Sequence, residues 1–252
     1  MSKIIVIGGT GLIGSKVVEK LRAHNHDAIP AAPSTGVNAV TGEGLADALA
    51  GAHVVVDVSN SPSFEANDVL EFFTSSTKNL LAAEKDAGVG HHVALTIVGT
   101  NRPQNIPYFR AKVAQEALIR DSGIPFTLVH ATQFFEFVAS IADISTEGET
   151  VTLPGGLVQP IAAEDVSTAV ARAAATAPLN GDIEIAGPER FGLDEFIRRG
   201  LAFREDPRTV VRDDSAPYYG AQIEERTLVP EDGAHVFETS LEDWLAMNST
   251  GK

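Results

Sequence analysis

The sequence predicts an α/β protein built on a doubly wound parallel sheet, and two observations carry this prediction. Short β-branched apolar runs alternate with segments of helical apolar spacing from residue 3 to about residue 186. Such alternation is typical of βαβ units, whose crossover connections place helices on both faces of a parallel sheet. The chain of 252 residues is also long enough to bury roughly three quarters of its unfolded surface, which suffices for one large core with a small appended lobe.

The first strand and the first helix have the clearest signals. Residues 4–7 are β-branched and apolar and are followed by glycines, which predicts a buried strand. Ile13, Val17 and Leu21 then recur on one face of a predicted helix.

The other core elements follow the same two patterns, and Gly88 marks the end of the longest predicted helix. In chain order they are a strand at 28–29, a strand at 54–58, a helix at 67–87, a strand at 92–98, a helix at 106–121, a strand at 126–129, a helix at 164–177 and a strand at 181–186. Residues 187–252 show short helical patterns and charged loops without strong strand signals. We therefore expect a core at 1–186 and a small C-terminal lobe at 187–252 that closes over the substrate site.

Composition excludes several classes of function. The sequence has no cysteine, which rules out disulfides, thiolate metal ligands and a cysteine nucleophile. The net charge of -15 and the lack of clustered Lys and Arg argue against a nucleic-acid partner. His91 and His92 have no further ligand at metal spacing, so we expect no metal site. Without an apolar run of membrane-spanning length or a signal peptide, we expect a soluble, cytoplasmic protein.

A glycine-rich turn follows the first strand directly and opens the first helix. Gly8 permits the tight turn, Gly11 lets backbone approach a pyrophosphate, and Gly14 allows close packing of helix and strand. The helix N-terminus adds free N–H groups and partial positive charge. We therefore predict a Rossmann-type dinucleotide site. Its candidate pyrophosphate-binding residues are Gly8, Thr10, Gly11, Leu12, Ile13 and Gly14.

The end of the second strand favours NADP over NAD. The position that usually carries an acidic residue for the adenosine ribose falls at about Ala32, and residues 30–36 contain no carboxylate. Ser34 and Thr35 offer hydroxyl groups for a 2′-phosphate, although an ordinary turn is the alternative interpretation because the segment has no Arg or Lys. Ser59, at the end of the third strand, should lie by the adenosine half of the cofactor.

Tyr108 and Lys112 are four residues apart and therefore share one face of a predicted helix. Tyr108 falls in the first turn, where the helix dipole and the nearby ammonium group favour the phenolate. Such a tyrosine can exchange a proton with a carbonyl or alcohol oxygen. The same spacing also occurs by chance on many helix surfaces, so its weight comes from its place downstream of a dinucleotide loop.

The sequence resembles the atypical, NmrA-like branch of the short-chain dehydrogenase/reductase superfamily over nearly its whole length. Four segments carry the resemblance: Gly8-Gly9-Thr10-Gly11-Leu12-Ile13-Gly14, Tyr108-Phe109-Arg110-Ala111-Lys112, Ala131-Thr132-Gln133-Phe134-Phe135-Glu136-Phe137 and Ala162-Ala163-Glu164-Asp165-Val166. It implies a Rossmann-type core with a smaller C-terminal lobe.

The resemblance also implies roles for individual residues. Tyr108 would be the acid/base, and Lys112 would contact the nicotinamide ribose and lower the tyrosine pKa. The hydroxyl partner of these two residues would be Thr96, unless the matching position is Val98, which has no hydroxyl. His130 and Thr132 lie where the family lines the nicotinamide, and a backbone-bonded histidine is the alternative for His130. The aromatic residues Phe134, Phe135 and Phe137 either wall an apolar substrate pocket or pack in the core.

The leading functional prediction is an NADP(H)-dependent oxidoreductase that transfers hydride between nicotinamide and a small carbonyl, quinone or enone substrate. The main alternative is a non-catalytic NADP(H)-binding redox sensor that acts through a protein partner. An isomerase or epimerase that retains its cofactor is a third possibility. We expect a monomer or a homodimer whose partner is a small molecule, with neither nucleic acid nor membrane involved.

Overall fold

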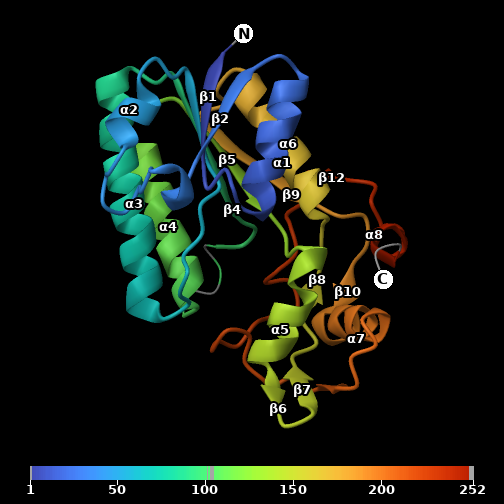
Figure 1. Ribbon diagram of the computed structural model, residues 1–252. Helices are drawn as coiled ribbons and strands as arrows, with labels where there is room; N and C mark the ends of the chain where they lie inside the picture. The colour runs from blue at the N-terminus through green and yellow to red at the C-terminus, as the bar shows by residue number, and fades with distance from the viewer. Residues whose placement is uncertain (1, 101, 103–104, 250–252) are drawn as a thin grey trace. The chain divides into compact units, whose positions relative to one another are not determined.

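The computed structural model describes residues 2–100, 102 and 105–249, which fold as two compact units (Figure 1). Unit 1 contains Met1–Thr96, Pro107–His130 and Val166–Ile183. Unit 2 contains Ile97–Ile106, Ala131–Asp165 and Glu184–Lys252. Each unit therefore combines segments that are distant in the sequence.

Unit 1 is built on the parallel sheet that the sequence predicted. Its strands are β1 (Lys3–Ile7), β2 (Asp27–Ala31), β3 (Val54–Asp57), β4 (His91–Ile97), β5 (Phe126–Ala131) and β9 (Gly181–Ala186), in the spatial order β9-β5-β4-β3-β1-β2. Ile7 is level with Ala31 on one side and with Asp57 on the other. The carboxyl ends of β1, β2 and β3 are therefore in register at one edge of the sheet, and ligands of such sheets bind beyond this edge.

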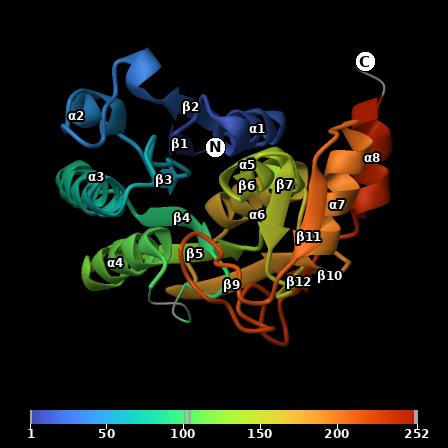
Figure 2. The same cartoon turned by 90° about the horizontal axis from the view of Figure 1, so that it is seen from below.

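Helices cover both faces of the sheet. They are α1 (Leu12–Ala23), α2 (Leu45–Leu49), α3 (Ala66–Ala87), α4 (Pro107–Asp121) and α6 (Ala163–Ala175), of which α6 belongs to unit 1 from Val166 onward. Figures 1 and 2 show α3 and α4 side by side on one face and α1 and α6 on the other. The doubly wound fold class is confirmed.

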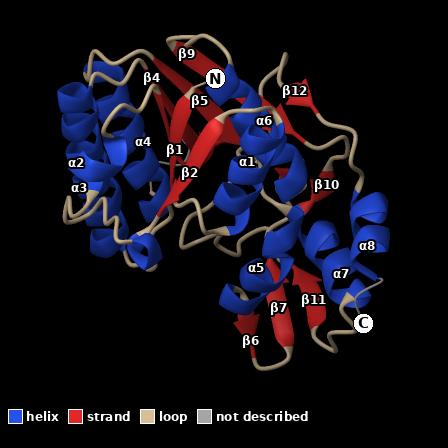
Figure 3. Ribbon diagram, turned by 45° about the horizontal axis from the view of Figure 1, so that its top comes forward, coloured by secondary structure: helices blue, strands red, loops and turns tan. Residues whose placement is uncertain are grey.

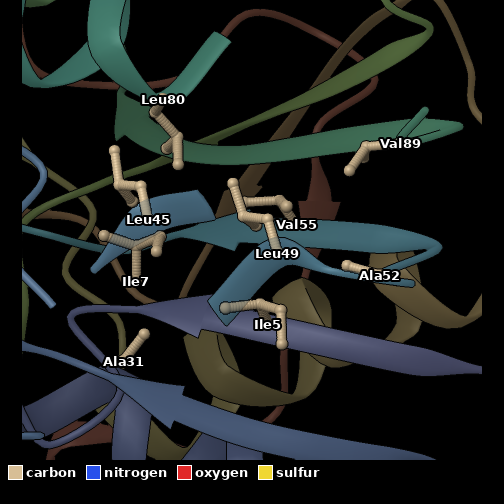
Figure 4. Packing of buried hydrophobic residues seen from close by; sticks show 9 residues of the cluster. All are labelled: Ile5, Ile7, Ala31, Leu45, Leu49, Ala52, Val55, Leu80 and Val89. Carbon is tan, nitrogen blue, oxygen red and sulfur yellow. The ribbon is translucent and has the colours of Figure 1, made fainter. Parts of the chain in front are cut away.

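The apolar core between the sheet and α2 and α3 shows why these segments fold as they do (Figure 4). β-branched residues of β1 and β3 meet leucines at helical spacing from α2 and α3. The cluster consists of Ile5, Ile7, Ala31, Leu45, Leu49, Ala52, Val55, Leu80 and Val89. The predicted stop of α3 is confirmed, because Gly88 takes the left-handed conformation (φ +71°) that favours glycine after a helix.

Unit 2 contains shorter elements (Figure 3). Its helices are α5 (Val138–Ile144), α7 (Leu193–Phe203) and α8 (Leu241–Ser249), and its small sheet has the order β11-β7-β6, with β6 (Thr146–Glu147), β7 (Thr150–Leu153) and β11 (Thr209–Arg212). β8 (Leu157–Val158) pairs with β10 (Phe191–Gly192), and β12 (His235–Val236) pairs in parallel with the end of β9, which extends the large sheet to seven strands. Residues 187–252 thus form strands, but each spans only two to four residues, too few for a periodic signal.

Glu136 joins separate segments of unit 2. Its carboxylate accepts hydrogen bonds from the Ala163 backbone N–H at 3.2 Å and from the indole N–H of Trp244 in α8 at 3.0 Å. β9 ends at Ala186, where the predicted core also ends; the division at 186 stays a prediction. Within the part of the chain that the structure describes, no helix is long and apolar enough to cross a membrane.

Candidate functional site

The glycine loop packs backbone against backbone at the carboxyl end of β1. Gly8 has φ +77°, and a Cβ atom there would lie 2.9 Å from the backbone of Ser59. A Cβ atom on Gly14 would lie 2.1 Å from the Gly8 carbonyl oxygen. Side chains at these two positions would therefore separate the loop from β3 and from α1, which explains why glycines are needed there.

The other side of the loop fits a dinucleotide pyrophosphate. Thr10, Gly11 and Leu12 are exposed, and a Cβ atom on Gly11 would meet only the Gly8 carbonyl oxygen, at 3.3 Å. Helix α1 begins at Leu12, and its first turn, which the structure describes in full, has no acidic side chain to repel an anion. Ile13 and Gly14 are buried, so only their backbone N–H groups in the first helical turn are suited to a phosphate.

The turn after β2 is held by a threonine hydroxyl. Residues Pro33–Thr35 form one 3₁₀ turn, and Thr35 Oγ1 both accepts from the Ala32 N–H and donates to the Ala32 carbonyl oxygen, each at 2.9 Å. Gly36 follows with φ +84°. The Thr35 hydroxyl therefore stabilises the turn itself, whereas Ser34 is exposed beside it.

A buried carboxylate at the end of β3 organises the loop that follows. Asp57 Oδ1 accepts hydrogen bonds from the Ser59 N–H at 3.0 Å and from the Ser59 hydroxyl at 2.6 Å. Asp57 Oδ2 accepts from Gln115 Nε2 in α4 at 3.0 Å. Sequence reasoning missed Asp57 and Gln115. An aspartate within the apolar run Val54–Val58 was the available signal, because a buried carboxylate needs partners.

Tyr108 lies in the first turn of α4, as predicted, and is half-buried. Its hydroxyl donates to Asn60 Oδ1 at 2.7 Å. Its ring packs edge-on against Phe73, with centroids 5.5 Å apart, and lies 5.8 Å from the ring of Phe64. Tyr108 therefore meets the loop that follows β3 and lies beside the residues that Asp57 holds.

Lys112 lies one turn deeper in the same helix and is 3% exposed. Its ammonium group donates to the Leu95 carbonyl oxygen at 2.8 Å and to Gln115 Oε1, and it lies 4.4 Å from the centroid of the Phe73 ring. Burial lowers the pKa of Lys112 to about 8, against the opposing effect of Asp57 and Glu116. Tyr108 and Lys112 thus share contact with Phe73, and the ribose contact implied by the resemblance stays a prediction.

Thr96 and His130 meet at a second buried carboxylate. The Thr96 hydroxyl donates to Glu116 Oε1 at 2.5 Å, and His130 Nδ1 lies 3.9 Å from the same oxygen. His130 Nε2 lies 3.9 Å from Asp182, which Arg120 binds through both carboxylate oxygens. No sequence pattern marks Glu116 as buried, because a charged residue on a helix is usually assigned to the solvent-exposed face.

In unit 2, Thr132 is buried, and its hydroxyl donates to the Gln159 carbonyl oxygen at 2.6 Å. Val98 is buried as well, and its N–H donates to the Ala131 carbonyl oxygen at 3.0 Å. Catalytic and cofactor-binding roles for Thr96, His130 and Thr132 stay predictions.

The three predicted pocket aromatics divide between two roles. Phe135 is buried against Phe196 and Trp244, so it belongs to the core of unit 2. Phe134 and Phe137 stack on each other with centroids 4.9 Å apart, and Phe137 is 38% exposed. Phe134 is buried, so of these three aromatic residues Phe137 alone exposes apolar surface. Over the described ranges, no group of three or more His, Asp or Glu side chains could hold a metal ion.

Comparison with known proteins supports a nicotinamide cofactor. A family model described as NAD(P)H-binding matches residues 8–177. The chain is 25% identical over 223 residues to divinyl chlorophyllide a 8-vinyl-reductase of Cucumis sativus, a match that covers 74% of this chain and 53% of that protein. The chain thus spans about half the length of this relative.

Two further proteins are similar over most of their length. A (4-alkanoyl-5-oxo-2,5-dihydrofuran-3-yl)methyl phosphate reductase of Streptomyces griseus is 29% identical over 227 residues, which cover 80% of this chain and 76% of that protein. The structure of the NADPH-dependent quinone oxidoreductase QOR2 of Escherichia coli, complexed with NADPH, superposes with a TM-score of 0.70 at 18% identity and covers 98% of this chain and 99% of that one. At this identity the structural likeness shows the fold alone.

Proposed function

The chain belongs to the NAD(P)H-binding family, and from this premise we propose that it is an NADP(H)-dependent oxidoreductase that reduces a small carbonyl, quinone or enone compound. The observation that carries the proposal is the glycine loop. Its exposed face at Gly11 and the start of α1 lie at the end of β1, level with the ends of β2 and β3. This arrangement supplies N–H groups and a helix dipole to a pyrophosphate.

The proposed preference for NADP depends on the turn after β2. Thr35 fixes the turn by bonding the backbone of Ala32, and Ser34 stands exposed beside it. Residues 30–36 have no carboxylate that would repel a 2′-phosphate. An NAD-specific site of this fold would instead carry an acidic residue for the ribose hydroxyls.

When bound, the reduced nicotinamide supplies a hydride to the substrate, and the protein has to supply a proton. We assign the proton to the Tyr108 hydroxyl, which is held at the carboxyl edge of the sheet by Asn60 and Phe73. The buried Lys112 ammonium group one turn away favours the phenolate that remains after proton transfer. Binding of a substrate oxygen would require the Tyr108 hydroxyl to turn from Asn60.

The relatives support a reductase with a conjugated or carbonyl-bearing substrate. One relative is named a vinyl-reductase, and another is named for an oxo-dihydrofuran phosphate, whose ring carbonyl is adjacent to an alkene carbon.

The test is a titration with NADPH and NADH, followed by turnover of NADPH with aldehydes, ketones, quinones and enones. We expect NADPH to bind about tenfold or more tightly than NADH, and absorbance at the nicotinamide band to fall with at least one substrate class. Equal affinity for the two dinucleotides would contradict the NADP preference. Tight NADPH binding without turnover on any compound would favour the redox sensor instead.

Asn60→Ala is the matched control for the assignment of Tyr108. Tyr108→Phe and Asn60→Ala both remove the hydrogen bond between these side chains, but only Tyr108→Phe removes the proton donor. We expect turnover to be lost in Tyr108→Phe and largely retained in Asn60→Ala. Equal losses would mean that the hydroxyl of Tyr108 has a structural role.

A further inference from the structure

A continuous chain of hydrogen bonds runs from the middle of α4 to the end of β3. Lys112 Nζ donates to Gln115 Oε1, and Gln115 Nε2 donates to Asp57 Oδ2 at 3.0 Å. Asp57 Oδ1 in turn accepts from the N–H and the hydroxyl of Ser59. The side chains of Lys112, Gln115 and Asp57 are only 3%, 1% and 2% exposed, respectively, so the two bonds that join them are shielded from water.

The charges at the two ends fix the direction of this chain. An ammonium group can only donate hydrogen bonds and a carboxylate can only accept them. The Gln115 amide therefore has one favourable orientation, with its oxygen toward Lys112 and its nitrogen toward Asp57. The Gln115 amide thus links a buried positive charge to a buried negative charge, and either charge left without a partner would be strongly unfavourable.

The far end of the chain lies against the glycine loop. Ser59 is adjacent to Gly8, because a Cβ atom on Gly8 would be 2.9 Å from Ser59 N and from Ser59 Cα. The preceding N–H, of Val58, donates to the Ile7 carbonyl oxygen at 3.0 Å. The position of the Ser59 backbone thus sets one side of the space in which the glycine loop turns.

We propose that Asp57 and Gln115 are positioning residues for the dinucleotide: with Lys112 they hold the Ser59 backbone against Gly8, so that the glycine loop is already shaped for a pyrophosphate before the cofactor arrives. The proposal rests on the cofactor site proposed above. Asp57 and Gln115 need not touch the cofactor, because a site that is ordered in advance loses less conformational entropy on binding.

Isosteric substitutions change the donors and acceptors in this series of hydrogen bonds without changing the volume of the side chains. Asp57→Asn sets an amide nitrogen against the amide nitrogen of Gln115, and Gln115→Glu sets a carboxylate against the carboxylate of Asp57. In the double variant Asp57→Asn/Gln115→Glu every bond can re-form: the new amide accepts from Ser59 and donates to the new carboxylate, which accepts from Lys112. The negative charge only moves from residue 57 to residue 115, its neighbour in the series of hydrogen bonds.

Each single variant should weaken NADPH binding about tenfold, and the double variant should bind within about twofold of wild type. Amide hydrogen exchange at Ser59 in the cofactor-free protein should accelerate in the single variants and recover in the double variant. Thr127→Val is the matched control, because it removes two hydrogen bonds of unit 1, one with His91 and one from the Leu179 N–H, at the opposite end of the strands. It should change neither quantity.

Two outcomes would overturn the proposal. One is unchanged NADPH affinity and Ser59 exchange in the single variants, and the other is a double variant that is no better than either single one. A wild-type protein that binds no dinucleotide would instead overturn the proposed function, and Ser59 exchange would still report whether Asp57 and Gln115 hold this backbone.

Discussion

Replacing Gly14 with alanine would separate the packing of the glycine loop from its use as a binding surface. An alanine Cβ at this position would lie 2.1 Å from the Gly8 carbonyl oxygen and 2.7 Å from Gly9 Cα. Ordinary contact of a Cβ atom begins at 3.4 Å, so α1 and the loop would have to separate by 3.4 − 2.1 = 1.3 Å. Side-chain rotation cannot relieve the clash, because both obstructing atoms belong to the backbone.

The expected cost follows from this overlap. Overpacking typically destabilises a protein by about 1–3 kcal/mol, and a backbone clash belongs at the upper end. In a protein of this size each kcal/mol lowers Tm by roughly 2–4 °C, so Gly14→Ala should lower Tm by about 6–12 °C. Gly11→Ala is the matched substitution, because its Cβ would meet only one atom, at 3.3 Å, on the exposed side of the loop. It should cost less than about 1 kcal/mol yet weaken NADPH binding about tenfold or more.

Two measurements on each variant separate the packing role of the glycine loop from its binding role. Thermal unfolding without dinucleotide reports packing, and a fluorescence titration with NADPH reports binding. A Gly14→Ala protein as stable as wild type would refute the close packing of α1 on the loop. A Gly11→Ala protein with wild-type affinity would refute the placement of the pyrophosphate at this face.

Three further predictions concern single side chains. Tyr108→Phe should leave the Kd for NADPH within about twofold of wild type and lower turnover by about 10²–10⁴-fold, as expected for loss of a general acid; steady-state kinetics would contradict the assignment if turnover persisted. Glu84→Gln should destabilise the protein by roughly 1–2 kcal/mol, because a neutral amide replaces the buried charged partner of His92, 2.8 Å away. Burial lowers the pKa of His92, but the effect of Glu84 is larger, and the pKa is raised above 6.5. The pair therefore stabilises the folded state most at acidic pH and less as the pH rises through the pKa of His92 in the folded state. Urea unfolding should accordingly show that Glu84→Gln lowers the free energy of unfolding more at about pH 5.5 than at about pH 8.5. Thr35→Val removes both bonds to Ala32 and should weaken NADPH binding more than NADH binding; equal weakening in competition titrations would argue against a 2′-phosphate at this turn.

Features that depend on local chain chemistry could be predicted from the sequence. The strand at β1, the turn at Gly8 and the end of α3 at Gly88 each depend on a few consecutive residues, and the structure has all three. The helix that carries Tyr108 and Lys112 is also predicted, because Pro107 suits the first position of a helix.

Contacts between distant segments could not be predicted in the same way. Gln115 binds a residue 58 positions away, and Thr96 binds Glu116 at a separation of 20 positions. No periodic pattern records such a pair, and polar residues on a helix are usually assigned to the solvent face. The difference between buried Phe135 and exposed Phe137 has the same origin, since it depends on Trp244, which is far along the chain.

The buried face of α4 carries polar side chains, and these limit how far the helix can shift or rotate. Apolar side chains tolerate small displacements, whereas Lys112, Gln115 and Glu116 each need particular partners. These polar contacts therefore fix both the rotation of α4 about its axis and its position along that axis. They thereby also fix the position of Tyr108 in the first turn. A one-residue insertion just before Lys112 would turn Tyr108 by about 100° about the helix axis. The insertion should therefore displace Tyr108 even though Lys112, Gln115 and Glu116 keep their partners.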